Sequence, residues 1–456
     1  MLPDYIAKCV ANPPEKRSPW YVNTAPSYAG VWLWVVFYQQ IARGTLDRAG
    51  LGWSLAGLVV AALLCYALFY FVPGMLGMKT GCPLSVVGTS TFGTTGGYLM
   101  PGLLMGVLQV GWVAVNTAVS TNFILQGLHM NPVPGRTPLE NLPFTAIAIV
   151  WCLLMTFVGI KGIRYVARVS IYLNAVAFLM IALVLFKTSG GIAHYSPPPN
   201  AVPFLGVTAM MQIVIGFFAT AGAAGVDFGM NSRDARDVKW GGLVGIALAA
   251  VYAGGCPLLS VAGARGINPG STIATYGDVI ALTGGLLASA MFFLFAIASV
   301  VPACFSSFIA SNSFSTMVPR LPRVATALAG AAVSILLAIT GLAGNLVNVF
   351  LIVGASFGPI CGAMTADYLV SGKRWAGPRR GINYAGYIAW ALGFAVGIIP
   401  FLPLGQGVKN YTQPQVLYSW ITGFLVYAVL SKVGMQPETV SLAAVEAKET
   451  PEMTLQ

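Results

Sequence analysis

The chain has 456 residues, of which 57% are hydrophobic and only 8% are charged, and its mean hydropathy is +0.78. A soluble domain carries roughly 25% charged residues, so this composition excludes a soluble globular protein and indicates a large lipid-facing surface. The net charge of +11 comes from 24 Lys and Arg against 13 Asp and Glu. We attribute this excess to the cytoplasmic loops of a membrane protein rather than to nucleic-acid binding.

Twelve apolar stretches are long enough to cross a membrane, because a helical crossing takes about 20 mostly apolar residues. The predicted spans, numbered here as helices 1–12, are 27–46, 51–73, 97–126, 143–160, 166–187, 204–228, 240–264, 284–314, 323–342, 345–371, 383–403 and 414–434. Residues 1–25 are predicted to form a cytoplasmic segment. Residues 435–456 are predicted to form a disordered cytoplasmic tail, since they are polar.

The loops between these spans differ in charge. With the N-terminus placed in the cytoplasm, eighteen of the 24 Lys and Arg fall on the inner side. The remaining six fall on the outer side: Arg43, Arg48, Arg136, Lys187, Arg265 and Lys409. Omitting one span would invert every later loop and remove this bias. We therefore predict that both termini are cytoplasmic and that the protein lies in the plasma (inner) membrane.

Helices 1 and 6 contain residues that suit an interrupted helix. Gln39 and Gln40 are adjacent in helix 1, and burying two amides is costly unless each finds partners. Helix 6 carries a run of small residues from Gly216 to Gly225. Transporters often bind substrate where paired helices unwind near the midplane. An interhelical Gln contact and a closely packed glycine-rich helix are the alternative interpretation.

Helix 3 presents one amide-and-indole face. Gln109, Trp112 and Asn116 are spaced i, i+3, i+7, so they share one side of the helix. Such a stripe can line a cavity and stack a flat ligand, although interhelical hydrogen bonding explains it as well. Helix 8 carries Ser306 and Ser307, whose hydroxyls can supply oxygens to a hard cation or bond to their own helix.

Acidic residues are missing from the centre of every predicted span. A carboxylate proton relay at the midplane is therefore not expected, and a site of neutral oxygens favours sodium over a proton as coupling ion. The sequence also offers no midplane combination of His, Asp, Glu and Cys that would support an intramembrane enzyme, and its seven Cys show no metal-binding spacing.

Several segments together are similar to one transporter family. They are Lys79-Thr-Gly with Phe92-Gly, Gly102-Leu-Leu-Met-Gly-Val-Leu-Gln-Val-Gly-Trp112, Gly216-Phe-Phe-Ala-Thr-Ala-Gly with Asp227-Phe, and Ala366-Asp-Tyr-Leu with Lys373-Arg and Asn383-Tyr. In combination they resemble the nucleobase:cation symporter-1 family, in particular its cytosine permease branch. The resemblance covers most of the chain from Lys79 to Pro400.

The resemblance implies an all-α membrane protein with a five-plus-five inverted repeat, which is a leucine-transporter-like fold. Within the twelve-helix transport domain, 26–434, residues 26–187 would form the first repeat, 204–371 the second, and 383–434 the two extra helices. It also implies secondary active uptake of a neutral planar heterocycle by cation-coupled symport. The substrate would be of the cytosine, purine, uracil, hydantoin or allantoin type.

The resemblance also implies site residues. In the family the base lies between an aromatic ring from helix 3 and one from helix 6, and these positions match Trp112 and Phe218. Gln109 matches a glutamine of the cytosine-transporting members, and Asn116 falls where hydantoin-transporting members have a substrate-binding glutamine. Thr220 matches a hydroxyl of helix 6.

The remaining implied residues concern helix 8 and the coupling ion. The segment Ser306-Ser-Phe-Ile-Ala-Ser-Asn312 resembles a family pattern in which a hydroxyl pair binds sodium and an Asn binds substrate. This implies Ser306 and Ser307 as sodium ligands and Asn312 as a substrate ligand. Main-chain carbonyls of Val36 and Ala303 would complete the ion site.

A nucleobase has two apolar faces and a polar edge, which aromatic rings and amides suit respectively. The amides of the predicted site carry no charge: Gln39, Gln40, Gln109, Asn116 and Asn312. This set fits a neutral heterocycle better than an amino acid. A transporter of amino acids or other small solutes with the same fold is the second hypothesis, and a channel is the third.

Overall fold

The computed structural model describes residues 2–39, 41–130, 137–318 and 320–440, with only the backbone for 162–171, 346, 347 and 350. In these residues the regular structure is helical, and the only bridges of the β type are the isolated pairs Ser18–Ser232 and Arg379–Thr439. This confirms the predicted all-α class.

Helix 1 is interrupted, as predicted. It consists of α2 (Thr24–Trp32), α3 (Val35–Tyr38) and the first part of α4 (Ile41–Leu64). The chain then turns into helix 2 at Gly50, where φ is 72° and ψ is −177°. These angles suit glycine, which lacks the Cβ that would clash there. Helix 2 continues through η2 (Cys65–Tyr70) and α5 (Phe71–Thr80).

Helices 3–5 follow after the short α6 (Leu84–Val87) and α7 (Thr89–Phe92). Helix 3 comprises η4 (Leu99–Leu103) and α8 (Leu104–Gly127). The single element α9 (Leu142–Thr188), followed by η6 (Ser189–His194), contains both apolar stretches that were predicted as helices 4 and 5.

Helix 6 continues through most of the predicted weak segment, 216–225, and is interrupted near the end of it. Its main part, α10 (Pro203–Ala223), runs through Gly216 and Gly222, and the turn comes only at Ala224, before α11 (Gly225–Gly229). The small residues of this segment pack closely: a Cβ at Gly222 would lie 2.7 Å from the Cβ of Phe69. Close packing therefore accounts for most of the glycine run.

The second half of the chain continues with helices 7–12. Their elements are α12 (Ala235–Gly242), η7 (Leu243–Leu248), α13 (Ala249–Ile267), α14 (Tyr276–Leu282), α15 (Gly285–Ala298), α16 (Val300–Met317), α17 (Arg323–Ile339), α18 (Leu346–Val370), α19 (Tyr384–Gly397), α20 (Gln406–Tyr411) and α21 (Gln415–Lys432). Helix 8 is split at Ser299, between α15 and α16.

Seven helical stretches of the described chain are long and apolar enough to cross a membrane: Ile41–Thr80, Gly96–Gly127, Leu142–Lys161, Tyr172–His194, Pro203–Ala223, Ala235–Ile267 and Gly285–Met317. The first of them includes the turn at Gly50. Two further apolar helices, Arg323–Ile339 and Tyr384–Gly397, are shorter. The membrane character is thus established, whereas the count of twelve crossings stays a prediction.

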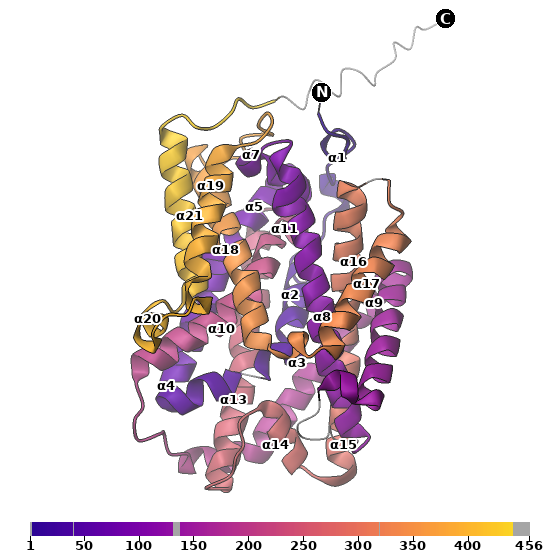
Figure 1. Ribbon diagram of the computed structural model, residues 1–456, viewed down its shortest axis with the longest axis vertical. Helices are drawn as coiled ribbons and strands as arrows, with labels where there is room; N and C mark the ends of the chain where they lie inside the picture. Colours follow the sequence, from indigo (N-terminus) through magenta and orange to yellow (C-terminus); the bar gives the residue numbers. More distant parts are fainter. Residues whose placement is uncertain (1, 40, 131–136, 319, 441–456) are drawn as a thin grey trace, which may run out of the picture.

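The helices form three packed groups (Figure 1). Elements of helices 1, 2, 6 and 7 contact each other most, as do those of helices 3, 4, 8 and 9. A third group contains α18, α19 and α21, and α18 joins it to α10. We call the first two the 1-2-6-7 group and the 3-4-8-9 group. The seam between them passes near α3 and α8, in the middle of the molecule.

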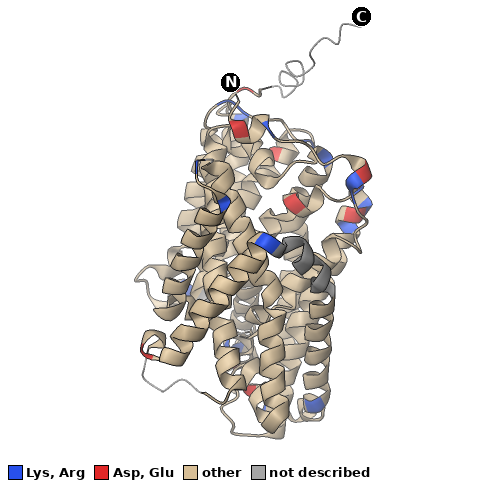
Figure 2. Ribbon diagram, turned by 90° about the vertical axis from the view of Figure 1, so that its right-hand side faces the viewer, with Lys and Arg blue, Asp and Glu red and all other residues tan. Residues whose placement is uncertain are grey.

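Charged residues gather at the end of the molecule that carries the N-terminus, and few lie in its broad middle (Figure 2). At this end the buried carboxylate of Asp367 forms an ion pair with Arg379, 3.1 Å away. It also accepts hydrogen bonds from Ser90, Thr91 and Tyr427. One buried charge pair thereby joins the loop before helix 3 with helices 10 and 12.

The start of the predicted tail is ordered in the structure. The main-chain N–H of Arg380 donates to the carbonyl of Glu438, and that of Val440 donates to Pro378. Residues 435–440 therefore pair with the loop between helices 10 and 11, in contrast to the predicted disorder. The rest of the tail, 441–456, lies outside the described residues.

Candidate functional site

The centre of the molecule holds a break in helix 1. α2 ends at Trp32, and Trp34 has extended backbone angles (φ −71°, ψ 123°) before the single turn of α3. An extended residue inside a helix turns its side chain out of the helical pattern. The break thereby points the indole of Trp34 at helices 3 and 6.

Three aromatic rings meet beside this break. The ring of Trp34 lies 5.5 Å from that of Trp112 on α8 and 6.2 Å from that of Phe217 on α10. Trp112 and Phe217 meet edge to face, with centroids 5.2 Å apart and planes at 82°. We call these three residues the aromatic cluster. It joins the 1-2-6-7 group to the 3-4-8-9 group.

The structure places Phe218 differently from the expectation. Its ring is fully buried and stacks on Trp32, with centroids 5.1 Å apart and planes at 7°. Adjacent residues of a helix point about 100° apart, so only one of the two phenylalanines can face helix 3. That residue is Phe217, and Phe218 instead packs within the 1-2-6-7 group.

Polar groups border the aromatic cluster. The indole Nε1 of Trp112 donates to Oγ1 of Thr220 over 3.2 Å, which links helices 3 and 6. Gln109, one turn from Trp112, is buried, and its Nε2 has only the Sδ of Met105 at 3.6 Å as partner. Because a thioether is a weak acceptor, most of the hydrogen-bonding capacity of Gln109 stays open to a ligand.

Asn116 is held inside the protein. Its Nδ2 donates to the carbonyl of Ser299 over 2.9 Å, at the split in helix 8. Its Oδ1 accepts hydrogen bonds from Trp151 (3.1 Å) and Ser120 (3.3 Å). Three internal bonds leave this amide one N–H for a ligand. Its substrate role stays a prediction, and its evident role is to tie helices 3, 4 and 8 together.

Gln39 contacts the outer helix α14. Its Oε1 accepts from the N–H of Gly277 over 3.1 Å, and its Nε2 lies 3.4 Å from Oγ1 of Thr275. Tyr38 packs edge to face on Tyr276. These contacts fix α14 against helix 1, and we call α14 the lid helix. The other predicted amide of helix 1, Gln40, lies outside the described residues.

The predicted ion ligands are buried. Ser306, Ser307 and Ala303 lie on α16, and Val36 lies on α3. The Oγ of Ser307 is 3.3 Å from Oγ1 of Thr156 on helix 4. This contact adds a third hydroxyl to the predicted pair and shows that helices 4 and 8 touch here.

The predicted substrate ligand Asn312 is half-buried on α16. The two residues that follow it, Ser313 and Phe314, pack against Gly106 of α8, one turn from Gln109. Asn312 directly precedes Ser313, whose hydroxyl donates to the carbonyl of Gly102. Its substrate role stays a prediction.

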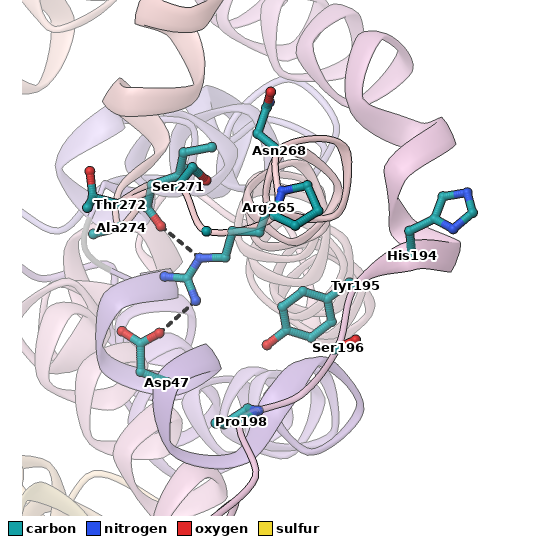
Figure 3. A pocket seen from close by; sticks show the side chains of 13 residues that line it. Asp47, His194, Tyr195, Ser196, Pro198, Arg265, Asn268, Ser271, Thr272 and Ala274 are labelled. Atoms are coloured by element: carbon teal, nitrogen blue, oxygen red, sulfur yellow. Dashed lines mark hydrogen bonds and ion pairs between the residues drawn. The ribbon is translucent and has the colours of Figure 1, made fainter.

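A separate polar cavity of about 510 Å³ opens at the other end of the molecule (Figure 3). Arg265, at the end of α13, donates to Asp47 over 2.6 Å and to the carbonyl of Ile273 over 2.7 Å. Tyr195 lies near this guanidinium, while His194 points away from it. Burial raises the pKa of the Tyr195 phenol, and the ion pair makes Asp47 the counter-ion of Arg265. The cavity contains none of the predicted site residues.

Comparison with known proteins bears directly on this arrangement. Residues 12–423 match the model of a family described as permeases for cytosine/purines, uracil, thiamine and allantoin. The chain belongs to this family. Cytosine permease of Escherichia coli K12 is 25% identical over 348 residues, covering 74% of this chain and 78% of that protein. Allantoin permease of Bacillus subtilis is 23% identical and covers 95% and 94% of the two chains.

Solved structures agree on the fold. Mhp1, a nucleobase-cation-symport-1 family transporter crystallised closed with bromovinylhydantoin bound, matches this permease with a TM-score of 0.67, 16% identity and coverage of 96% and 99%. A Na⁺-coupled sialic acid symporter matches with a TM-score of 0.61, 15% identity and coverage of 96% and 93%. The leucine-transporter-like fold expected from the sequence is thereby confirmed.

Sequence reasoning did not single out two residues of the aromatic cluster, Trp34 and Phe217, or Trp32, whose ring stacks on Phe218. The two tryptophans lie in an apolar run, where they resemble lipid-facing aromatics. One signal was available, because Trp32-Leu-Trp34 directly precedes the residues suspected of breaking helix 1. For Phe217, only the rotation of helix 6 decides between two adjacent phenylalanines.

Proposed function

We propose that this permease imports a neutral planar heterocycle of the nucleobase, hydantoin or allantoin type, by cation-coupled symport and alternating access. The observation that carries the proposal is the aromatic cluster at the break in helix 1, bordered by Gln109 and Thr220. Aromatic rings suit the faces of a flat ligand, each good contact adding about 0.5–1.5 kcal/mol beyond burial. An open amide suits its edge.

We propose Trp112 and Phe217 as the two walls of the substrate site. They come from helices 3 and 6, and their edge-to-face contact is one that a flat ring can replace by stacking on both. Gln109, Asn312 and the remaining N–H of Asn116 would then serve the polar edge. The relatives support the substrate class, since one carries the name cytosine permease and another allantoin permease.

We propose sodium as the coupling ion, bound between helices 1 and 8. Ser306, Ser307 and the carbonyls of Ala303 and Val36 supply neutral oxygens, which suit a hard cation. The Na⁺ coupling of the structurally similar sialic acid symporter supports this choice. Bound sodium would favour the conformation with higher substrate affinity, which couples ion and substrate uptake.

One set of measurements tests the substrate and the ion together. Thermal-shift and uptake experiments would compare cytosine, uracil, purines, hydantoins and allantoin, each in sodium and in potassium. We expect saturable uptake of at least one heterocycle, stabilisation that depends on sodium, and loss of both in Trp112→Ala. The matched control is Trp53→Ala, because that indole is 53% exposed on α4. Selective stabilisation by an amino acid, or single-channel currents, would replace the proposal with one of its alternatives.

We also propose that both termini face the cytoplasm. The concentration of charge at the N-terminal end of the molecule (Figure 2) supports this orientation, because Lys and Arg are enriched in cytoplasmic loops. Reporter fusions to each terminus, active only on one side of the inner membrane, would test it.

A further inference from the structure

Two buried indole groups in the centre of the protein have unused hydrogen-bond donors. The Nε1 atoms of Trp32 and Trp34 are buried and have no hydrogen-bond partner among the residues that the structure describes. Most buried polar side-chain atoms in proteins are paired, so each exception calls for a reason. A buried donor without an acceptor costs about 1–3 kcal/mol.

The position of Trp34 distinguishes it from Trp32. The ring of Trp32 stacks on Phe218 inside the 1-2-6-7 group. Trp34 is 95% buried at the break of helix 1, and its ring contacts both proposed walls, Trp112 and Phe217. A flat ligand between those walls would therefore have its edge within reach of Trp34.

Two other nitrogen groups near Trp34 already donate within the protein, whereas Gln109 and the second N–H of Asn116 stay open. The Nε1 of Trp112 donates to Thr220, and the Nδ2 of Asn116 donates to Ser299. An indole nitrogen can only donate, whereas an amide can present either a donor or an acceptor. Trp34 therefore imposes a requirement that the amides do not: the ligand atom opposite it must be an acceptor.

We propose that Trp34 is a specificity-determining residue, whose Nε1–H donates to a carbonyl oxygen on the edge of the substrate. This inference rests on the proposed function and sharpens it, because it requires an oxo rather than an amino group at one position on the edge of the substrate. An amino group at the same place would set one donor against another and leave the indole N–H unpaired. Sites that hydrogen-bond one group reject an analogue that cannot complete the bond.

Two ligand pairs test this requirement. Uracil carries an oxo group and a neighbouring ring N–H where cytosine carries an amino group and an unprotonated ring nitrogen. Hypoxanthine and adenine differ in the same way. Affinities would be measured for the full-length protein in detergent with sodium present, by thermal shift and by competition against uptake of the best substrate. We expect the wild type to favour the oxo member of at least one pair by about tenfold or more, as one buried hydrogen bond allows.

The variant Trp34→Phe keeps an aromatic ring and removes the N–H together with part of the indole, so the readout of the hydrogen bond is the change in the ratio of the two affinities. We expect it to weaken binding of the oxo ligand by about tenfold, to leave the amino ligand within about twofold, and so to abolish the preference. The control Trp53→Phe removes an exposed indole from α4 and should leave both affinities unchanged. If Trp34→Phe fails to fold, the wild-type preference still decides, since equal or stronger binding of the amino ligands overturns the inference.

The inference and the proposed function fail in different ways. If the wild type binds none of the heterocycles, the proposed function falls, and the inference falls with it. If the wild type takes up a heterocycle but Trp34→Phe shifts both members of the pair equally, the proposed function stands. In that case Trp34 is only a wall of the site.

Discussion

The ion pair between Asp367 and Arg379 offers a sharp test of how the N-terminal end of the molecule is held. Their side chains are only 4% and 9% exposed. Arg379→Met removes the cation and leaves the carboxylate buried, which typically costs 3–5 kcal/mol. Since three hydroxyls still donate to Asp367, we expect the lower end, about 3 kcal/mol.

The magnitude translates into a melting temperature. An unfolding entropy of about 2.1 cal/mol/K per residue gives roughly 0.96 kcal/mol/K for a chain of 456 residues, so the apparent Tm should fall by about 3 °C. Thermal-shift measurements in detergent would record it. The matched control is Arg380→Met, because that neighbouring side chain is exposed, and we expect its Tm to stay within about 1 °C of wild type.

A double variant separates the loss of the pair from the loss of contacts. Asp367→Asn combined with Arg379→Met leaves no buried charge, so it should recover part of the lost stability. Equal Tm values for Arg379→Met and Arg380→Met would refute this reasoning. So would a double variant whose destabilisation is the sum of the two single ones.

Three further predictions concern the lid helix α14, the amide of Asn116, and the ion pair between Asp47 and Arg265. Gln39→Ala should speed maleimide labelling of a Val279→Cys reporter, because Val279 is buried on α14; lower substrate affinity with unchanged labelling would instead make Gln39 a substrate ligand. Asn116→Leu leaves the indole N–H of Trp151 unpaired and removes one of the two hydrogen bonds to the carbonyl of Ser299, so stability should fall by about 1–3 kcal/mol, and an unchanged Tm would contradict that role. Asp47→Asn should shift Tm by no more than about 1 °C, because its ion pair with Arg265 is partly exposed; a larger shift would show a structural role.

The sequence predicted best those features that depend on long runs of residues, such as the positions of the apolar helices. Hydropathy placed the helices within a few residues, because about 20 apolar residues are needed for each crossing. The break in helix 1 was predictable from Gln39 and Gln40, although the extended residue is Trp34. For helix 6, three glycines suggested unwinding. Gly222 serves close approach to Phe69, and the turn at Ala224 lies at the end of the predicted segment.

Individual contacts were less predictable. Asn116 shares a helix face with Gln109 and Trp112, yet its amide is engaged by Ser299 and Trp151, which are distant in sequence. Helix rotation likewise decides between Phe217 and Phe218, and a rotation is fixed only by packing against other helices. Composition and residue spacing within one helix cannot predict the rotation of that helix, because the rotation is fixed by its packing against other helices.

The aromatic cluster spans the seam between the two helix groups, since Trp34 and Phe217 belong to one group and Trp112 to the other. A ligand held there acts as a spacer, and its thickness sets how near the groups can approach. A flat ring would allow closure, whereas a bulky substituent above the ring plane would work as a wedge. Molecules of the second kind are expected to bind tightly and yet arrest the cycle, which makes substrate and inhibitor differ by shape alone.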